Sequence, residues 1–165
     1  MLFHKVDGKS PCPPKRFKRK TSRSSKNSAS SLRDAGMVEF VGIVDVHLME
    51  GKNLIVKDII SSDPYCVLSL GFQTRKSTTK KNSLNPLYNE HFSFSWNGKD
   101  ELVIEIFDHD DLSKDDHMGV VTIDLGFLHN NPEKSFQSWH PVTHRKHRDR
   151  QQGELDIELT YTPIQ

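Results

Sequence analysis

Apolar and polar residues alternate along several short segments of the chain. Residues 44–48, 92–96, 102–106 and 155–161 each place an apolar side chain at every second position. This spacing is typical of a strand with one buried face. Four further strands are predicted at residues 65–70, 74–81, 120–125 and 136–142, of which 74–81 is apolar on neither face.

Turn sequences separate these segments. They combine Gly, Asn and Pro at residues 50–53, 84–86, 97–100 and 130–132. No segment shows a convincing helical period over about 11 or more residues. Short strands at this spacing predict an all-β domain, an eight-stranded antiparallel β-sandwich of two four-stranded sheets.

Charge divides the chain into two parts. Residues 1–36 carry 10 Lys and Arg against 2 Asp and Glu, a formal charge of +8, which leaves 13 against 20, or −7, for the remainder. The first part is rich in Ser, Lys and Arg and has too few apolar residues to offset the entropy of ordering. We therefore expect residues 1–37 to be a disordered basic tail and residues 38–165 to form one folded domain.

The acidic excess is concentrated in two loops. Asp108 and Asp110 end one predicted strand, where residues two apart share a face, and Asp116 returns at the next. The loop between the first two predicted strands adds Asp58 and Asp63. Like charges held together repel unless a cation lies among them, and calcium accepts about 6 to 8 oxygen ligands in flexible geometry.

Two other interpretations of the acidic residues compete with a calcium site. A solvated acidic turn is the alternative for an isolated pair of aspartates, and the second acidic loop weakens it. An EF-hand fails, because counting from Asp108 puts Ser113 where glycine is required and Gly119 where a bidentate glutamate belongs.

Several short motifs follow one another along the chain: Ser62-Asp63-Pro64-Tyr65, Leu84-Asn85-Pro86 with Asn89-Glu90, and Asp108-His109-Asp110 with Asp116 and Met118-Gly119. In order and spacing, this series resembles the C2 domain family. The loop sequences look most like plant-type and multi-C2 proteins. The resemblance implies two or three calcium ions at one end of the sandwich, and the place of the last strand implies the type II topology. The ligands that it implies are Asp58, Asp63, Asp108, Asp110 and Asp116, with Ser113 as a lesser one.

The resemblance also implies calcium-dependent binding to anionic phospholipid membranes. Uncompensated ligand carboxylates repel a leaflet whose surface potential is about −30 mV, and bound calcium reverses that repulsion. Apolar side chains at the loop tips would then insert into the membrane, and a basic cluster would hold phosphoinositide headgroups. The alternatives are that the isoleucines among the tips pack inward and that the cluster is an ordinary solvated basic face. The tips are Ile59, Ile60 and Leu112, and the cluster is Arg75, Lys76, Lys80 and Lys81. Asp111 departs from synaptotagmin-like loops, which often carry a basic residue there.

The expected role is a membrane-targeting signalling module and not an enzyme. The sequence lacks a G-x-S-x-G elbow, a phosphate loop and an H-E-x-x-H helix. His140, His144 and His147 lie among like charges without cysteines, so we do not expect zinc there. The alternatives are a calcium-independent protein-interaction C2 domain, or the targeting segment of a larger signalling or lipid enzyme. We expect a monomer that binds phosphatidylserine, with phosphoinositides and a protein partner as open additions.

Composition favours the cytoplasm, with peripheral membrane association when calcium rises. The chain has only Cys12 and Cys66, and it has no apolar run near the roughly 18 residues of a membrane span. The basic tail could add attraction to an anionic surface. The competing interpretation of Lys15–Lys20 is a nuclear-localisation or nucleic-acid-binding segment; nuclear localisation stays open, and we do not expect a nucleic-acid partner.

Overall fold

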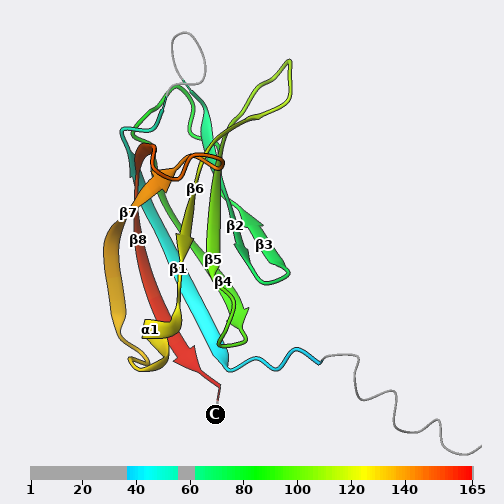
Figure 1. Cartoon of the computed structure of the whole chain (residues 1–165), viewed down its shortest axis with the longest axis vertical. Coiled ribbons are helices and arrows are strands. Elements are labelled where there is room, and N and C mark those ends of the chain that lie inside the picture. The colour runs from blue at the N-terminus through cyan, green and yellow to red at the C-terminus, as the bar shows by residue number, and fades with distance from the viewer. Residues whose placement is uncertain (1–36, 56–61, 165) are drawn as a thin grey trace, which may run out of the picture. The chain divides into compact units, whose positions relative to one another are not determined.

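Nearly all of the regular structure is β-strand. The computed structural model describes residues 37–55 and 62–164 (Figure 1). A short helix, α1 (Gly126–His129), lies between β6 and β7. The strands are β1 (Gly42–Lys52), β2 (Pro64–Leu70), β3 (Gln73–Lys76), β4 (Leu87–Trp96), β5 (Leu102–Asp108), β6 (Asp116–Ile123), β7 (Ser135–Thr143) and β8 (Gln151–Pro163).

The strands form two antiparallel layers. Their hydrogen-bonded order is β3-β2-β5-β6-β7-β8-β1-β4. Because β6 and β7 pair only where Val120 lies opposite Thr143, the array divides there into the layers β3-β2-β5-β6 and β7-β8-β1-β4 (Figure 1). The predicted eight-stranded antiparallel sandwich is therefore confirmed. β8 lies between β7 and β1, which is the strand order of the predicted type II topology.

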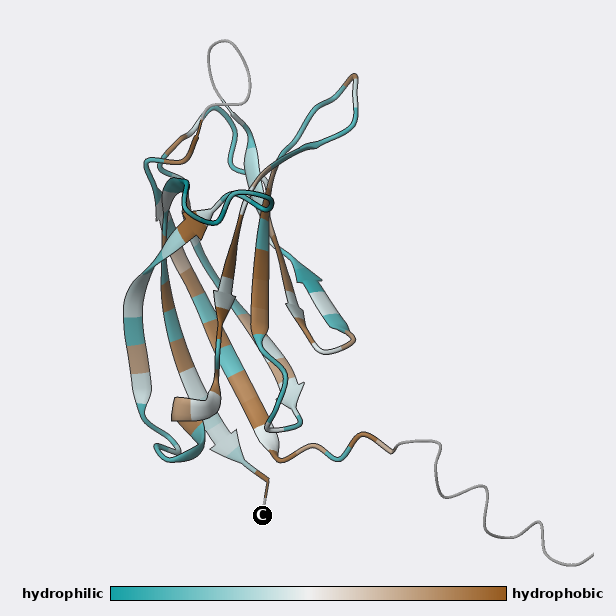
Figure 2. Cartoon of the chain, viewed as in Figure 1, coloured by the Kyte–Doolittle hydropathy of each residue, from teal (hydrophilic) through white to brown (hydrophobic). Residues whose placement is uncertain are grey.

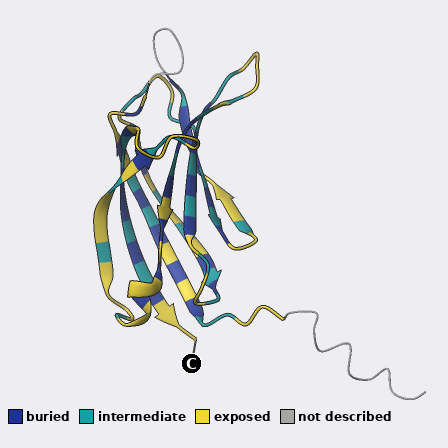
Figure 3. Cartoon of the chain, viewed as in Figure 1, coloured by how far each residue is buried: buried dark blue, intermediate teal, exposed yellow. Residues whose placement is uncertain are grey.

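Inward-facing residues of both layers share one core. Val44 and Val46 of β1 and Ile104 and Ile106 of β5 are completely buried in the same apolar cluster. Figure 2 shows apolar and polar bands alternating along these strands, and Figure 3 shows the corresponding alternation of burial. Burying each such side chain contributes about 1.5–3 kcal/mol, so the period-two pattern fixes which face of each strand points inward.

The predicted strand at residues 74–81 is wrong in its second half. β3 ends at Lys76, and the chain then turns inward at Ser77, whose side chain is buried and accepts a hydrogen bond from the Cys66 amide at 2.8 Å. Lys80 N and Ser83 N donate to backbone oxygens of residues 64 and 62. The β3–β4 connection therefore runs along the start of β2, toward the acidic loops.

Within the described residues, no helix has the length and hydropathy that crossing a bilayer requires. The predicted boundary between residues 37 and 38, and the predicted disorder of the tail, concern residues that lie almost entirely outside the described part of the chain.

Gly153 allows β8 to support the end of β1. Its φ is +109°, and an added Cβ would lie 2.7 Å from the carbonyl oxygens of both Lys52 and Asn53. Ile55 N donates to Gln152 O at 3.3 Å just beyond this crossing. A glycine is required here, and it sets the start of the connection that leads to β2.

We predict that Gly153→Ala destabilises the domain by about 2–4 kcal/mol, because a strained backbone dihedral angle alone costs about 1–3 kcal/mol and the added Cβ meets rigid backbone atoms. The measurement is the urea midpoint at constant slope. Gly126→Ala is the matched control, because its Cβ would contact the Asp124 side chain and its φ is not positive. Equal midpoints for the two variants would contradict the prediction.

Candidate functional site

The described ends of the β1–β2 connection, residues 53–55 and 62–63, meet two other connections at one end of the sandwich (Figure 1). These join β3 to β4 and β5 to β6. Asp108 is the last residue of β5, and its Cα partners are Pro64 at the start of β2 and Asp116 at the start of β6. The strand register therefore places Asp108 between two chain segments that also carry aspartates.

Asp63 joins these three connections by hydrogen bonds. Its amide donates to Asp108 Oδ1 at 2.6 Å, and its carbonyl oxygen accepts from the His109 amide at 3.0 Å. Its carboxylate Oδ1 accepts from the Asn82 amide at 2.8 Å. The β1–β2 and β3–β4 connections are thus both tied to the end of β5 through one residue.

Asp108 has a carboxylate oxygen that protein donors leave unsatisfied. The residue is 3% exposed, and within the described part of the chain its Oδ2 has no hydrogen-bond partner. Burying a polar atom without a partner is unfavourable, and for a charged carboxylate the cost is larger unless a cation compensates it. This atom is the structural observation that fits the implied calcium.

The other predicted ligands lie along the same connections. The Ser113 hydroxyl donates to Asp110 Oδ2, and Asp116 is exposed. Among residues 37–55 and 62–164, no three acidic, imidazole or thiol side chains lie close enough together to hold a metal ion. Asp58, Ile59 and Ile60 lie outside the described residues, so the full ligand set stays a prediction. Leu112, in contrast, is completely exposed at the tip of the β5–β6 connection.

Asp115 organises the β5–β6 connection, a role that the sequence did not reveal. Its Oδ2 accepts from the Tyr65 hydroxyl at 2.7 Å, and its Oδ1 accepts from the Asp110 amide at 3.0 Å and lies 3.2 Å from His109 Nδ1. The Tyr65 hydrogen bond, followed by that of the Asp110 amide, lowers the pKa of Asp115 to about 2. Because this pKa is lower in the folded than in the unfolded protein, the ionised carboxylate stabilises the fold at pH values above its unfolded pKa. That stabilisation is lost as the pH falls toward 2.

His109, which belongs to this network, also lies beside a second acidic residue of the loop. His109 Nε2 lies 3.3 Å from Asp111 Oδ1. Burial, reinforced by the hydrogen bond to Asp115, raises the pKa of Tyr65 to about 12, so the phenol remains a donor. Asp111, which departs from synaptotagmin-like loops, therefore has a neighbouring imidazole as its partner. No sequence spacing indicated these contacts, because Tyr65 is some fifty positions from Asp115.

The predicted basic cluster is divided between β3 and the segment that follows it. Lys76 Nζ lies 3.7 Å from the centre of the Tyr65 ring, and Arg75 lies 5.5 Å from that of Phe94. Lys80 Nζ lies 3.6 Å from Glu90 Oε1. Lys81 is exposed. Much of this charge is therefore engaged with protein groups.

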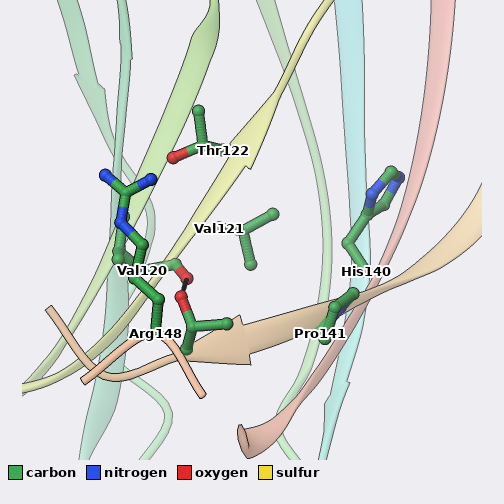
Figure 4. A pocket seen from close by; sticks show the side chains of 7 residues that line it. Val120, Val121, Thr122, His140, Pro141 and Arg148 are labelled. Atoms are coloured by element: carbon green, nitrogen blue, oxygen red, sulfur yellow. Dashed lines mark hydrogen bonds between the residues drawn. The ribbon is translucent and has the colours of Figure 1, made fainter. Parts of the chain in front are cut away.

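A small cavity lies apart from the acidic residues, beside the point where β6 and β7 diverge. Its volume is about 230 Å³, and Figure 4 shows Arg148 and His140 on opposite sides of it. Burial lowers the pKa of the His140 imidazole. A second cavity of about 460 Å³ adjoins it and is lined by Glu105, Arg145 and Arg148 among others. No predicted calcium ligand that the structure describes lines either cavity, so the candidate site is the set of loops.

We predict that Asp108→Asn stabilises the calcium-free protein by about 1–3 kcal/mol, the range expected for relieving a buried unsatisfied polar group. Asparagine keeps an acceptor for the Asp63 amide and removes the charge. The measurement is the thermal midpoint in the presence of a chelator. Asp45→Asn is the control, because Asp45 is exposed and accepts from Ser93. A midpoint that stays level or falls in Asp108→Asn would show that the buried oxygen carries no cost.

Comparisons with known proteins agree with the fold. The family model "C2 domain" matches residues 42–142. The chain is 43% identical over 91 residues to the ADP-ribosylation factor GTPase-activating protein AGD12 of Arabidopsis thaliana, which covers 54% of this chain and 27% of the relative. Across the first three curated relatives, the chain spans between 27% and 54% of their length.

Solved structures are similar over most of the chain. The first C2 domain of a plant Extended Synaptotagmin 1 has a TM-score of 0.70 and 26% identity, covering 77% of this chain and 98% of that one. The calcium-bound pair of C2 domains of Extended-Synaptotagmin 2 has a TM-score of 0.64 and 28% identity, covering 74% and 46%. These likenesses support a membrane-targeting module in general terms.

Proposed function

The chain belongs to the C2 domain family, and from that premise we propose that it binds calcium at its loop end and then attaches to membranes containing anionic phospholipids. The observation that carries the proposal is Asp108 Oδ2, a buried carboxylate oxygen without a protein donor in the described part of the chain. In the strand register, Asp108 lies opposite Pro64, the residue after Asp63, on one side and opposite Asp116 on the other. Non-catalytic recruitment to a membrane is the role that follows.

The residues that would hold calcium are carboxylates from two connections. Asp108 and Asp63 are already in contact, and Asp110 and Asp116 lie on the same β5–β6 connection. We include Asp58 and, as a lesser ligand, Ser113 in the proposed set. Bound calcium would supply positive charge and coordination positions for lipid phosphate or carboxylate oxygens.

The charge of the loop end explains why lipid attachment would depend on calcium. Residues 108–116 contain five aspartates against Lys114, a formal charge of −4 with histidine neutral. That charge opposes approach to an anionic leaflet. Asp115 and its partners hold the connection in shape, with Asp116 and Leu112 exposed to solvent.

We predict calcium-dependent pelleting with phosphatidylserine-containing vesicles, and its loss in Asp108→Asn/Asp110→Asn. The reason is that Asp108 carries the unsatisfied oxygen and Asp110 is the next proposed ligand along the chain. The measurement is co-sedimentation of the whole chain in calcium and in chelator. Asp45→Asn/Asp124→Asn is the charge-matched control, because both residues are exposed and lie outside the β5–β6 connection. Unchanged calcium dependence in the Asp108→Asn/Asp110→Asn variant would refute the proposed ligands.

Leu112→Ser should weaken calcium-dependent vesicle binding by roughly ten- to a hundredfold without changing calcium affinity, because an exposed leucine buried in the membrane contributes about 1.5–3 kcal/mol. The measurement is a vesicle titration at saturating calcium. Phe72→Ser is the control, because Phe72 is 72% exposed in the β2–β3 turn at the other end of the strands. Equal losses in the two variants would argue against insertion of the β5–β6 tip.

A second candidate function is a calcium-independent protein-interaction module. It is favoured by the extent to which protein donors already satisfy the acidic connection: Asn82 N bonds Asp63, Ser113 bonds Asp110, and Tyr65 bonds Asp115. Absence of vesicle pelleting in both calcium and chelator, from a chain that its thermal midpoint shows to be folded, would favour this candidate.

A further inference from the structure

A basic connection joins β7 to β8 near the acidic loops. β7 ends at Thr143, which pairs with Val120, four residues after β6 begins at Asp116. At about 3.3 Å per residue, the base of the connection lies roughly 13 Å along β6 from Asp116. Residues 144–150 are referred to below as the basic loop.

The basic loop carries a concentrated and largely unpaired positive charge. It contains Arg145, Lys146, Arg148 and Arg150 against Asp149, a formal charge of +3 with histidine neutral, and all five residues are exposed. Arg145 Nη1 lies 3.7 Å from Glu105 Oε1. Within the described part of the chain, no carboxylate lies at ion-pair distance from Lys146, Arg148 or Arg150.

Hydrogen bonds fold the basic loop into a defined turn. The His144 amide donates to Arg150 O at 3.1 Å, and the Arg150 amide donates to His147 O at 3.0 Å. His144 Nδ1 accepts from the amides of Lys146 and His147 at 3.1 and 3.2 Å. Because the backbone is already ordered, presenting these cations to a charged surface costs less entropy than it would from an unstructured segment.

The basic loop is better suited to an external anion than the predicted cluster at β3. Lys76 packs on Tyr65, and Lys80 is paired with Glu90. The two groups also lie at opposite edges of one layer, since β3 is its first strand and β6, beside the basic loop, is its last. A membrane that meets the loop end can therefore approach one edge more closely than the other.

We propose that the basic loop is a second contact with the anionic lipid surface, that it acts without calcium, and that it turns the β6–β7 side of the sandwich toward the membrane. The proposal deepens the proposed membrane function but does not need its calcium step. Each cation near an anionic surface favours binding by about fivefold. Three of them offset part of the repulsion from the acidic connection before calcium binds.

The test compares two variants of the whole chain, each lacking three exposed cations. One is Lys146→Gln/Arg148→Gln/Arg150→Gln, and the matched control is Arg75→Gln/Lys76→Gln/Lys81→Gln. Binding to phosphatidylcholine vesicles with and without phosphatidylserine is titrated in chelator and in calcium. Every protein keeps the same basic tail, so the effect of the tail cancels when the affinity of each variant is divided by that of the unaltered chain. Thermal midpoints check that each variant is folded.

In chelator, we expect the basic-loop variant to lose at least about tenfold in affinity for phosphatidylserine vesicles, and the control to lose less. Calcium affinity without lipid should not change. An unaffected basic-loop variant, or an equal loss in the control, would overturn the proposal, and in the first case a protein partner would become the better occupant. If the expected loss occurs but calcium changes the vesicle affinity of none of the proteins, the proposal for the basic loop is supported and the proposed calcium step is wrong.

Discussion

The hydrogen bonds between Asp63 and the end of β5 are the constraint on which the loop end depends. Asp63 donates to Asp108 through its amide and accepts from His109 and Asn82. Two connections, far apart in sequence, are thereby fixed to one strand end. The same bond occupies one oxygen of Asp108, and the other is buried without a donor among the described residues. A bound cation would balance the charge of that carboxylate.

Most of the fold could be predicted from the sequence, because burial on one face of a strand imposes a period of two. Val44 to Leu48 and Leu155 to Tyr161 follow that period, and they lie in adjacent strands of one layer. The failure at residues 77–81 has the same cause. That segment has no apolar face, so hydrogen bonds to β2 set its course instead, and the alternation of side chains gives no indication of those bonds.

The sequence predicts a set of candidate residues for the site but not their arrangement. Short motifs single out Asp63, Asp108 and Asp110, since their positions relative to strand ends are visible in the sequence. The role of Asp115 is not visible there, because it depends on the hydroxyl of Tyr65 across the strand register. A count of charges treats Asp115 and Asp116 alike. In the structure, Asp115 has three polar neighbours, whereas Asp116 is exposed.

Opposite charges on neighbouring connections divide the proposed membrane surface. The β5–β6 connection is acidic, while the connection from β7 to β8 is basic and lies beside β6. Attraction at the basic connection and repulsion at the acidic one would favour a tilted approach to the membrane. Neutralising the acidic connection would then allow the apolar tip at Leu112 to reach the lipid. The outer faces of the two layers need not take part.

Titration calorimetry of calcium into the whole chain tests the central claim most directly. The account predicts a saturable heat with more than one ion per chain, a rise in melting temperature, and loss of that saturable heat in Asp108→Asn. No heat up to millimolar calcium, together with an unchanged melting temperature, would contradict it.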